Sequence, residues 1–167
     1  MEIKKFTRLS MLLSLSIVLK IIESFIPFFN GIIPGLRLGL TNTITLLVLF
    51  IYGFKDAFTL SILRVFLVGI LRTGLFSFPF FFSLGGVVLS ITMMNLVKKT
   101  GLSIIGVSII GSITHSIGQI IMAYFLLNTN SIFYYLPWLL LFSIPTGIVI
   151  GLISKELVNY FQKRLNF

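Results

Sequence analysis

The residues of this chain that could do chemistry are ionisable or amide side chains that interrupt or border long apolar stretches. They are Glu23, Arg37, Asn42, Arg64, Arg72, His115 and Gln119, together with Lys20. In a bilayer, a charged side chain near the centre costs about 2.5 to 3.5 kcal/mol on insertion scales. Each buried charge therefore needs an internal partner or a functional role.

The charged residues allow two interpretations. Lys20 and Glu23 are three residues apart and can pair on one helix, and Glu23 is close enough to the end of its stretch to reach Arg37 or Arg72. Arg64 and Arg72 are eight residues apart, so they share a helix face two turns apart. One interpretation is a structural set of internal ion pairs between Glu23 and an arginine. The other is a cationic site open to the outside, because a planar guanidinium binds a carboxylate or phosphate through two hydrogen bonds.

A second polar group is a stripe of small and polar residues at helical spacing. It consists of Ser108, Gly111, Ser112, His115, Gly118 and Gln119. Small residues let helices approach closely, and polar residues hydrogen-bond between helices, so we expect the serines and glycines to form a packing contact. His115 and Gln119 are one turn apart and could equally form a hydrogen-bonding wall of a cavity.

Catalysis is hard to assemble from the remaining residues. The chain has one histidine, no cysteine and four acidic residues, too few for a metal-coordination shell. Its single aspartate is Asp56, which leaves no Ser-His-Asp set and no paired carboxylates for Mg²⁺-diphosphate chemistry. A phosphate loop of the GxxxxGK type is also absent, so the chain itself cannot hydrolyse ATP. We therefore expect no enzyme activity, no cofactor and no metal site.

Six apolar stretches must position these residues, and they fill almost the whole chain. Its 167 residues have a mean hydropathy of +1.11, and a bilayer core about 30 Å thick needs roughly 20 apolar residues per helix. The sequence predicts an all-α membrane protein, a bundle of six transmembrane helices in one domain, 1–167. The predicted spans are 9–27, 36–53, 56–73, 80–97, 102–127 and 134–158.

The basic residues predict the orientation. With the N-terminus in the cytoplasm, Arg37 and Arg72 lie outside and nine basic residues lie inside, as the positive-inside rule requires. The nine are Lys4, Lys5, Arg8, Lys55, Lys98, Lys99, Lys155, Lys163 and Arg164. Both termini are thus predicted to be cytoplasmic, in a protein of the plasma membrane. Because topology explains the net charge of +9, we expect no nucleic-acid binding.

Two irregular segments fall on the predicted outer side. Prolines and glycines end the first helix and delay the second between 27 and 36. The segment 73–83 contains Gly74, Pro79 and five phenylalanines. Irregular backbone at this depth is tolerated where protein or a water-filled cavity covers it, so we expect such a cover over both segments.

Pairs of small residues at four-residue spacing occur on two stretches. They are Ser10 with Ser14 on the first and Gly147 with Gly151 on the last. Such pairs allow close helix contacts. The serine pair could belong to an internal packing face or to a docking surface for another membrane protein.

Seven segments in a fixed order carry a family resemblance. They read ESFIP at 23–27, PGLRLGLTN at 34–42, LR at 63–64, GLFSF at 74–78, SLGG at 83–86, GSITHSIGQ at 111–119 and YLP at 135–137. Together they resemble the Gx transporter family, whose members are also labelled heptaprenyl diphosphate synthase component I, over about 8–160. Arg37 keeps the family's basic residue. Thr41 replaces an expected alanine and Ser116 an expected asparagine, which changes the polarity beside the predicted site.

The family is in turn similar to the substrate-binding S components of energy-coupling factor transporters. This resemblance implies a six-helix protein that binds a vitamin or metal from outside and has both ends in the cytoplasm. It also implies assembly with a membrane T protein and two cytosolic ATPases, with Ser10 and Ser14 as the docking residues. A vitamin-like anionic solute would fit Arg37, Arg72 and the phenylalanines of 76–82.

The prenyl synthase label implies a different role. Prenyl synthases hold Mg²⁺-diphosphate on aspartate-rich motifs, and this chain has one aspartate. The sequence therefore favours a solute-binding subunit, with a noncatalytic membrane subunit of heptaprenyl diphosphate or quinone synthesis as the alternative. In the favoured role, Arg37 and Arg72 contact the anion, Arg64 and Glu23 form a buried pair, and His115 and Gln119 form the wall, with Asn42 nearby.

Overall fold

The described residues fold into α-helices, and short connections join the helices from α2 to α6. The computed structural model describes residues 2–25 and 39–165. Its elements are α1 (Glu2–Phe25), α2 (Leu40–Ile51), α3 (Phe54–Val68), the π-helical turn η1 (Gly69–Thr73), α4 (Phe78–Lys98), α5 (Ile104–Leu127), the 3-10 segment η2 (Asn130–Tyr135) and α6 (Leu136–Leu165). These residues contain no β-strand, so the predicted all-α fold is confirmed for the described part of the chain.

The outermost helices extend beyond the predicted spans. α1 begins at Glu2 rather than near residue 9, and α6 continues to Leu165 rather than ending near residue 158. Hydropathy marks only the part of a helix that suits lipid, whereas lysine, arginine and glutamate also propagate a helix in water. Lys163 and Arg164 in the last turn of α6 additionally suit the negative end of its dipole.

Three described segments are long and apolar enough to cross a membrane, and the chain is accordingly a membrane protein. They are α4, α5 and the continuous segment Asn130–Arg164 formed by η2 and α6. α2 has only 12 residues, about 18 Å of helix at 1.5 Å per residue. That length is shorter than a hydrocarbon core of about 30 Å. Six complete membrane crossings therefore remain a prediction.

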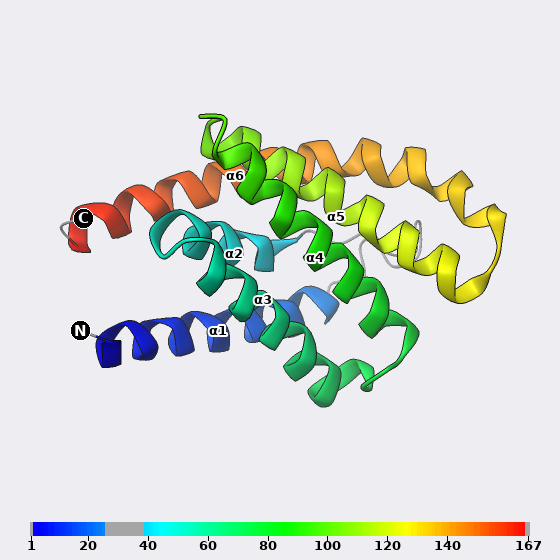
Figure 1. Cartoon of the computed structure of the whole chain (residues 1–167), viewed down its shortest axis with the longest axis horizontal. Helices are drawn as coiled ribbons and strands as arrows, with labels where there is room; N and C mark the ends of the chain where they lie inside the picture. The colour runs from blue at the N-terminus through cyan, green and yellow to red at the C-terminus, as the bar shows by residue number, and fades with distance from the viewer. Residues whose placement is uncertain (1, 26–38, 166–167) are drawn as a thin grey trace.

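The short helix α2 lies at the centre of the bundle. Figure 1 shows it between α1 and α6. Leu46, Leu47, Val48 and Leu49 are almost completely buried, and the core cluster around them includes residues from all six of these α-helices. Four consecutive buried residues mean that α2 is enclosed on every side, which explains why it is apolar all round.

Glycines set the contacts among α4, α5 and α6. An added Cβ on Gly118 of α5 would lie 2.5 Å from the carbonyl oxygen of Gly85 on α4. An added Cβ on Gly147 or Gly151 of α6 would lie 2.8 Å from a Cα atom of α5. Only hydrogen fits at these distances, so the helix backbones touch. The predicted packing role of these small residues is confirmed.

The start of α1 and the end of α6 lie at the same end of the molecule, together with the α2–α3 turn (Figure 1). Basic side chains make contacts there: Lys5 forms an ion pair of 2.7 Å with Asp56, and Lys98 Nζ donates to the carbonyl oxygen of Leu49 at 2.8 Å. We call this the basic end. The other end, which we call the opposite end, carries η2 and the neighbouring ends of α5 and α6, whereas α1 ends and η1 lies between the two ends (Figure 1).

Candidate functional site

A buried carboxylate near the C-terminus of α1 is the first part of the site. Glu23 is 6% exposed. It accepts a hydrogen bond from Lys20 Nζ at 3.0 Å, which confirms the predicted pairing, and another from the backbone N–H of Gly39. Gly39 is the N-cap of α2, and it has no side chain that could accept hydrogen bonds from the free backbone N–H groups at the start of this helix. Glu23 therefore satisfies one of these donors and meets the positive end of the α2 dipole.

Arg64 of α3 is the second part, and it binds α2 as well. It is 4% exposed, and its Nη1 donates to the carbonyl oxygen of Thr41 at 2.9 Å and to Thr45 Oγ1 at 3.1 Å. The Thr45 hydroxyl also lies 3.2 Å from Ser61 Oγ. The carboxylate of Glu23 is near enough to attract the guanidinium electrostatically. The two charges thus interact through space while each makes hydrogen bonds with α2.

The charges of this group do not cancel. Lys20 and Arg64 are cations and Glu23 is a single carboxylate, so the sum is +1. Asp56 pairs with Lys5 at the basic end and cannot balance it. All hydrogen bonds of Arg64 in the described part of the chain come from Nη1, which leaves Nε and Nη2 as donors for a further acceptor. We call Lys20, Glu23 and Arg64 the buried charge group; it has the charge and the donors to hold an anion.

Arg72 lies in the π-helical turn η1 and contacts a different helix. Its Nη1 donates to the carbonyl oxygen of Ile21 at 3.2 Å, and its guanidinium carbon lies 4.6 Å from the centre of the Phe25 ring. The predicted common face of Arg64 and Arg72 assumed 3.6 residues per turn, but the π-helical turn changes the phase of the helix after Val68. As a result, Arg64 is buried against α2, whereas Arg72 is exposed and contacts α1.

Two further predicted residues belong to the N-terminal side of α2. Asn42 is half-buried, and its backbone N–H donates to the carbonyl oxygen of Gly39 at 2.7 Å. It therefore lies in the first turn of α2, beside the amide that Glu23 binds. Arg37 and the predicted outer loop 27–36 lie outside the described residues.

His115 and Gln119 form a separate group where α5 crosses α4. Both are half-buried. An added Cβ on Gly86 of α4 would lie 2.9 Å from His115 Cε1 and 3.0 Å from Gln119 Cγ. The two side chains therefore lie together, as their four-residue spacing predicted, and pack on the α4 backbone. They belong to the α4–α5 contact, whereas the buried charge group belongs to α1 and α3 and binds α2.

The hydroxyl residues around Arg64 were not among the predicted site residues. Thr41 and Thr45 are four residues apart on α2, and Ser61 is three residues before Arg64 on α3. Each spacing places the two residues on one helix face, which was the available signal. The sequence spacing could not reveal that this face of α2 packs against this face of α3.

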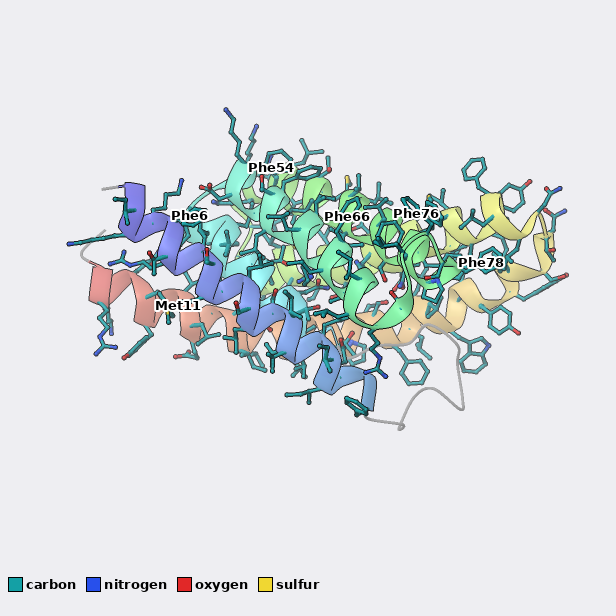
Figure 2. The ribbon with its side chains drawn as sticks, turned by 90° about the horizontal axis from the view of Figure 1, so that it is seen from below. Phe6, Met11, Phe54, Phe66, Phe76 and Phe78 are labelled. Atoms are coloured by element: carbon teal, nitrogen blue, oxygen red, sulfur yellow. The ribbon has the colours of Figure 1, made fainter. Side chains whose placement is uncertain are left out.

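The phenylalanine-rich segment forms a ring cluster toward the opposite end. The ring centre of Phe80 lies 5.3 Å from that of Phe66, 5.8 Å from that of Phe76 and 5.5 Å from that of Phe81. Figure 2 shows Phe66, Phe76 and Phe78 following one another toward this end. Phe76 has a φ of 61°, a left-handed conformation that is uncommon for a bulky residue. Strained residues and π-helical turns both recur at functional sites.

The predicted docking residues lie on the surface of α1. Ser10 and Ser14 are both exposed, and the Ser14 hydroxyl donates to the carbonyl oxygen of Ser10 at 3.0 Å. An internal packing face is therefore ruled out for this pair. The surface that it occupies is available to lipid or to a partner.

Two acidic side chains, Glu23 and Asp56, pair with lysines and lie far apart in the bundle. Glu23 pairs with Lys20 and Asp56 with Lys5. In residues 2–25 and 39–165 no group of three or more His, Cys, Asp or Glu side chains could hold a metal ion. The arrangement favours recognition of an anion through arginine.

Comparison with known proteins identifies the family. No curated protein and no solved structure gives a significant match to the chain. A family model described as heptaprenyl diphosphate synthase component I matches residues 12–157, which include the buried charge group and the α4–α5 crossing. The match covers well over half of the sequence. The chain therefore belongs to the heptaprenyl diphosphate synthase component I family.

Proposed function

We propose that the chain is the solute-binding membrane subunit of an importer and that its solute is a small vitamin-like or cofactor-like anion. The observation that carries the proposal is the buried charge group, in which the single carboxylate of Glu23 pairs with Lys20 and attracts Arg64 only through space. Excess positive charge inside a membrane protein is costly. A carboxylate or phosphate that enters this group removes the excess.

Arg64 is the main recognition residue in this proposal. Thr41 and Thr45 fix its Nη1, so the remaining edge of the guanidinium is already oriented before the solute arrives. Pre-orientation reduces the entropy lost on binding. The N-terminus of α2 adds its positive dipole end beside Glu23. Arg72 on η1 and the half-buried Asn42 provide further contacts on the outer side.

The import reaction requires an external energy source, because the sequence has no phosphate loop. In our proposal the chain sits in the plasma membrane with both termini in the cytoplasm and assembles with a membrane T protein and two cytosolic ATPases. The exposed pair Ser10 and Ser14 on α1 is the docking surface. Small side chains there let a partner helix approach closely.

The family description favours a second candidate function. The chain would then be a membrane subunit that accompanies a prenyl diphosphate synthase. With a single aspartate, Asp56, engaged by Lys5, it would be noncatalytic and would support a soluble, aspartate-rich partner. A diphosphate product is an anion too, so the buried charge group is compatible with both candidates.

Purification from the native membrane distinguishes the importer from the prenyl synthase subunit. The tagged protein is isolated in mild detergent, and its copurifying proteins and small molecules are identified by mass spectrometry. A T protein with two ATPases that is lost in the variant Ser10→Leu/Ser14→Leu supports the importer. Thr92→Leu is the matched control, because Thr92 is an exposed hydroxyl residue on α4. Recovery of a prenyl synthase without ATPases would refute the importer and support the alternative.

A further inference from the structure

A groove between α1 and α3 runs from the basic end toward the middle of the molecule. It has a volume of about 240 Å³ and is lined by Phe6, Leu9, Ser10, Leu13, Asp56, Thr59, Leu60 and Leu63. On each helix the first and last lining residues are seven residues apart, about 10 Å along the axis at 1.5 Å per residue. The ion pair between Lys5 and Asp56 joins the first turns of the two helices. The groove therefore runs along both helices from the same end.

The two ends of this α1–α3 groove differ in chemistry. At the basic end Asp56 lines the groove and holds Lys5 at 2.7 Å, and Lys55 lies one turn before Thr59 on the exposed face of α3. Deeper in the groove the walls are leucines, namely Leu9, Leu13, Leu60 and Leu63. A charged head and an apolar body are also the two parts of a phospholipid.

The groove is open sideways to the surroundings of the bundle. Phe6 is 73% exposed and lies near the start of α1 in Figure 2, and Thr59 and Leu63 are exposed on the other wall. A lipid chain can enter it from the bilayer without any movement of the helices.

The basic end carries more positive than negative side chains. The first two turns of α1 and the first turn of α3 carry Lys4, Lys5, Arg8 and Lys55 against Glu2 and Asp56, a sum of +2. Basic residues at the membrane surface attract anionic headgroups. A zwitterionic lipid also has a phosphate, but its own ammonium group offsets that charge, whereas an anionic lipid brings a net negative charge to the lysines.

We propose that the α1–α3 groove binds one acyl chain of an anionic phospholipid and that Lys5 and Lys55 hold its phosphate. A helix of another protein is a poorer occupant, because close helix contacts need small residues along the seam and the groove offers only Ser10 and Thr59 beside Phe6 and four leucines. Ser10 borders both the groove and the proposed docking surface, whereas Ser14 does not line the groove. The site lies at the basic end, apart from the buried charge group, and is independent of the proposed solute.

Lipid titration monitored by native mass spectrometry tests the proposal. The detergent-purified protein is titrated with phosphatidylglycerol and with phosphatidylcholine of the same chains. We expect phosphatidylglycerol to be retained several-fold more strongly, and Lys55→Gln to remove this preference. Lys99→Gln is the matched control, since Lys99 is an exposed lysine in the α4–α5 turn. Equal retention of the two lipids, or an equal loss in both variants, would overturn the proposal.

A crosslinking experiment identifies the occupant. The chain has no cysteine, so Leu63→Cys can carry a single photoreactive label in the groove, and Leu96→Cys on the exposed face of α4 controls for lipid that only surrounds the protein. We expect a phosphatidylglycerol adduct in preference to phosphatidylcholine at position 63 and no preference at position 96. A polypeptide adduct at position 63 would instead assign the groove to a partner or a second copy. Displacement of the lipid by glycerol phosphate would reduce the site to a phosphate site, which also contradicts the acyl-chain proposal.

Discussion

Replacement of Glu23 by glutamine tests whether the buried charge group governs the stability of the bundle. Glutamine keeps a carbonyl oxygen that can accept the hydrogen bond from the Gly39 amide, so the contact between α1 and α2 can persist. What disappears is the only negative charge beside Lys20 and Arg64. The variant therefore isolates the electrostatic contribution from the capping contribution.

The magnitude follows from burial. Removing one partner of a buried ion pair costs about 3–5 kcal/mol, because the remaining charge is left uncompensated. For a chain of this size that corresponds to a decrease in melting temperature of about 6–20 °C. Asp56→Asn is the matched control: it also removes one carboxylate bound to one lysine, but the two side chains are 23% and 47% exposed. Such a pair is worth about 0–1 kcal/mol.

Thermal unfolding in one detergent, followed by the helical circular-dichroism signal, compares the two variants. A Glu23→Gln variant that melts within about 4 °C of the Asp56→Asn variant, the range that about 1 kcal/mol covers, would refute the reasoning. The double variant Glu23→Gln/Arg64→Met then tests whether the two charges are coupled. We expect it to lose less stability than the sum of the single variants, since coupled neighbours deviate from additivity by about 0.5–3 kcal/mol. Strict additivity would mean that Glu23 and Arg64 act independently.

Three further variants test the site and the packing. Arg64→Ala should lower the yield and the melting temperature, because it removes two charge-assisted hydrogen bonds of about 1.5–3 kcal/mol each; a variant as stable as the parent would contradict the contacts with Thr41 and Thr45. Arg72→Ala should cost little stability, because its contacts with α1 are exposed: a hydrogen bond of 3.2 Å to the Ile21 carbonyl and a cation–π contact worth about 0.5–1 kcal/mol. It should nevertheless weaken binding of the copurified anion measured by calorimetry; unchanged affinity would remove Arg72 from the site. Gly118→Ala should cost about 1–3 kcal/mol through overpacking against α4, whereas Gly106→Ala near the start of α5 should be neutral or slightly stabilising; equal melting temperatures would be inconsistent with the backbone contact.

Local patterns in the sequence determined much of this protein. Hydropathy located the six helices, because each must bury or present an apolar surface over many residues. The three-residue spacing of Lys20 and Glu23 predicted their ion pair, and the four-residue spacing of Gly147 and Gly151 predicted a close helix contact. These features depend on the periodicity of one helix, so a single stretch of sequence contains all the information that they require.

Only the tertiary structure decided which helix faces meet. The sequence shows Arg64 and the hydroxyls of Thr45 and Ser61, but only the packing of α3 on α2 brings them together. The π-helical turn after Val68 directs Arg72 to α1 although the eight-residue spacing indicated a common face with Arg64. Periodicity fixes the direction of a side chain relative to its own helix, whereas its partner depends on the rotation and offset of a neighbouring helix, which are set by the packing of the whole bundle.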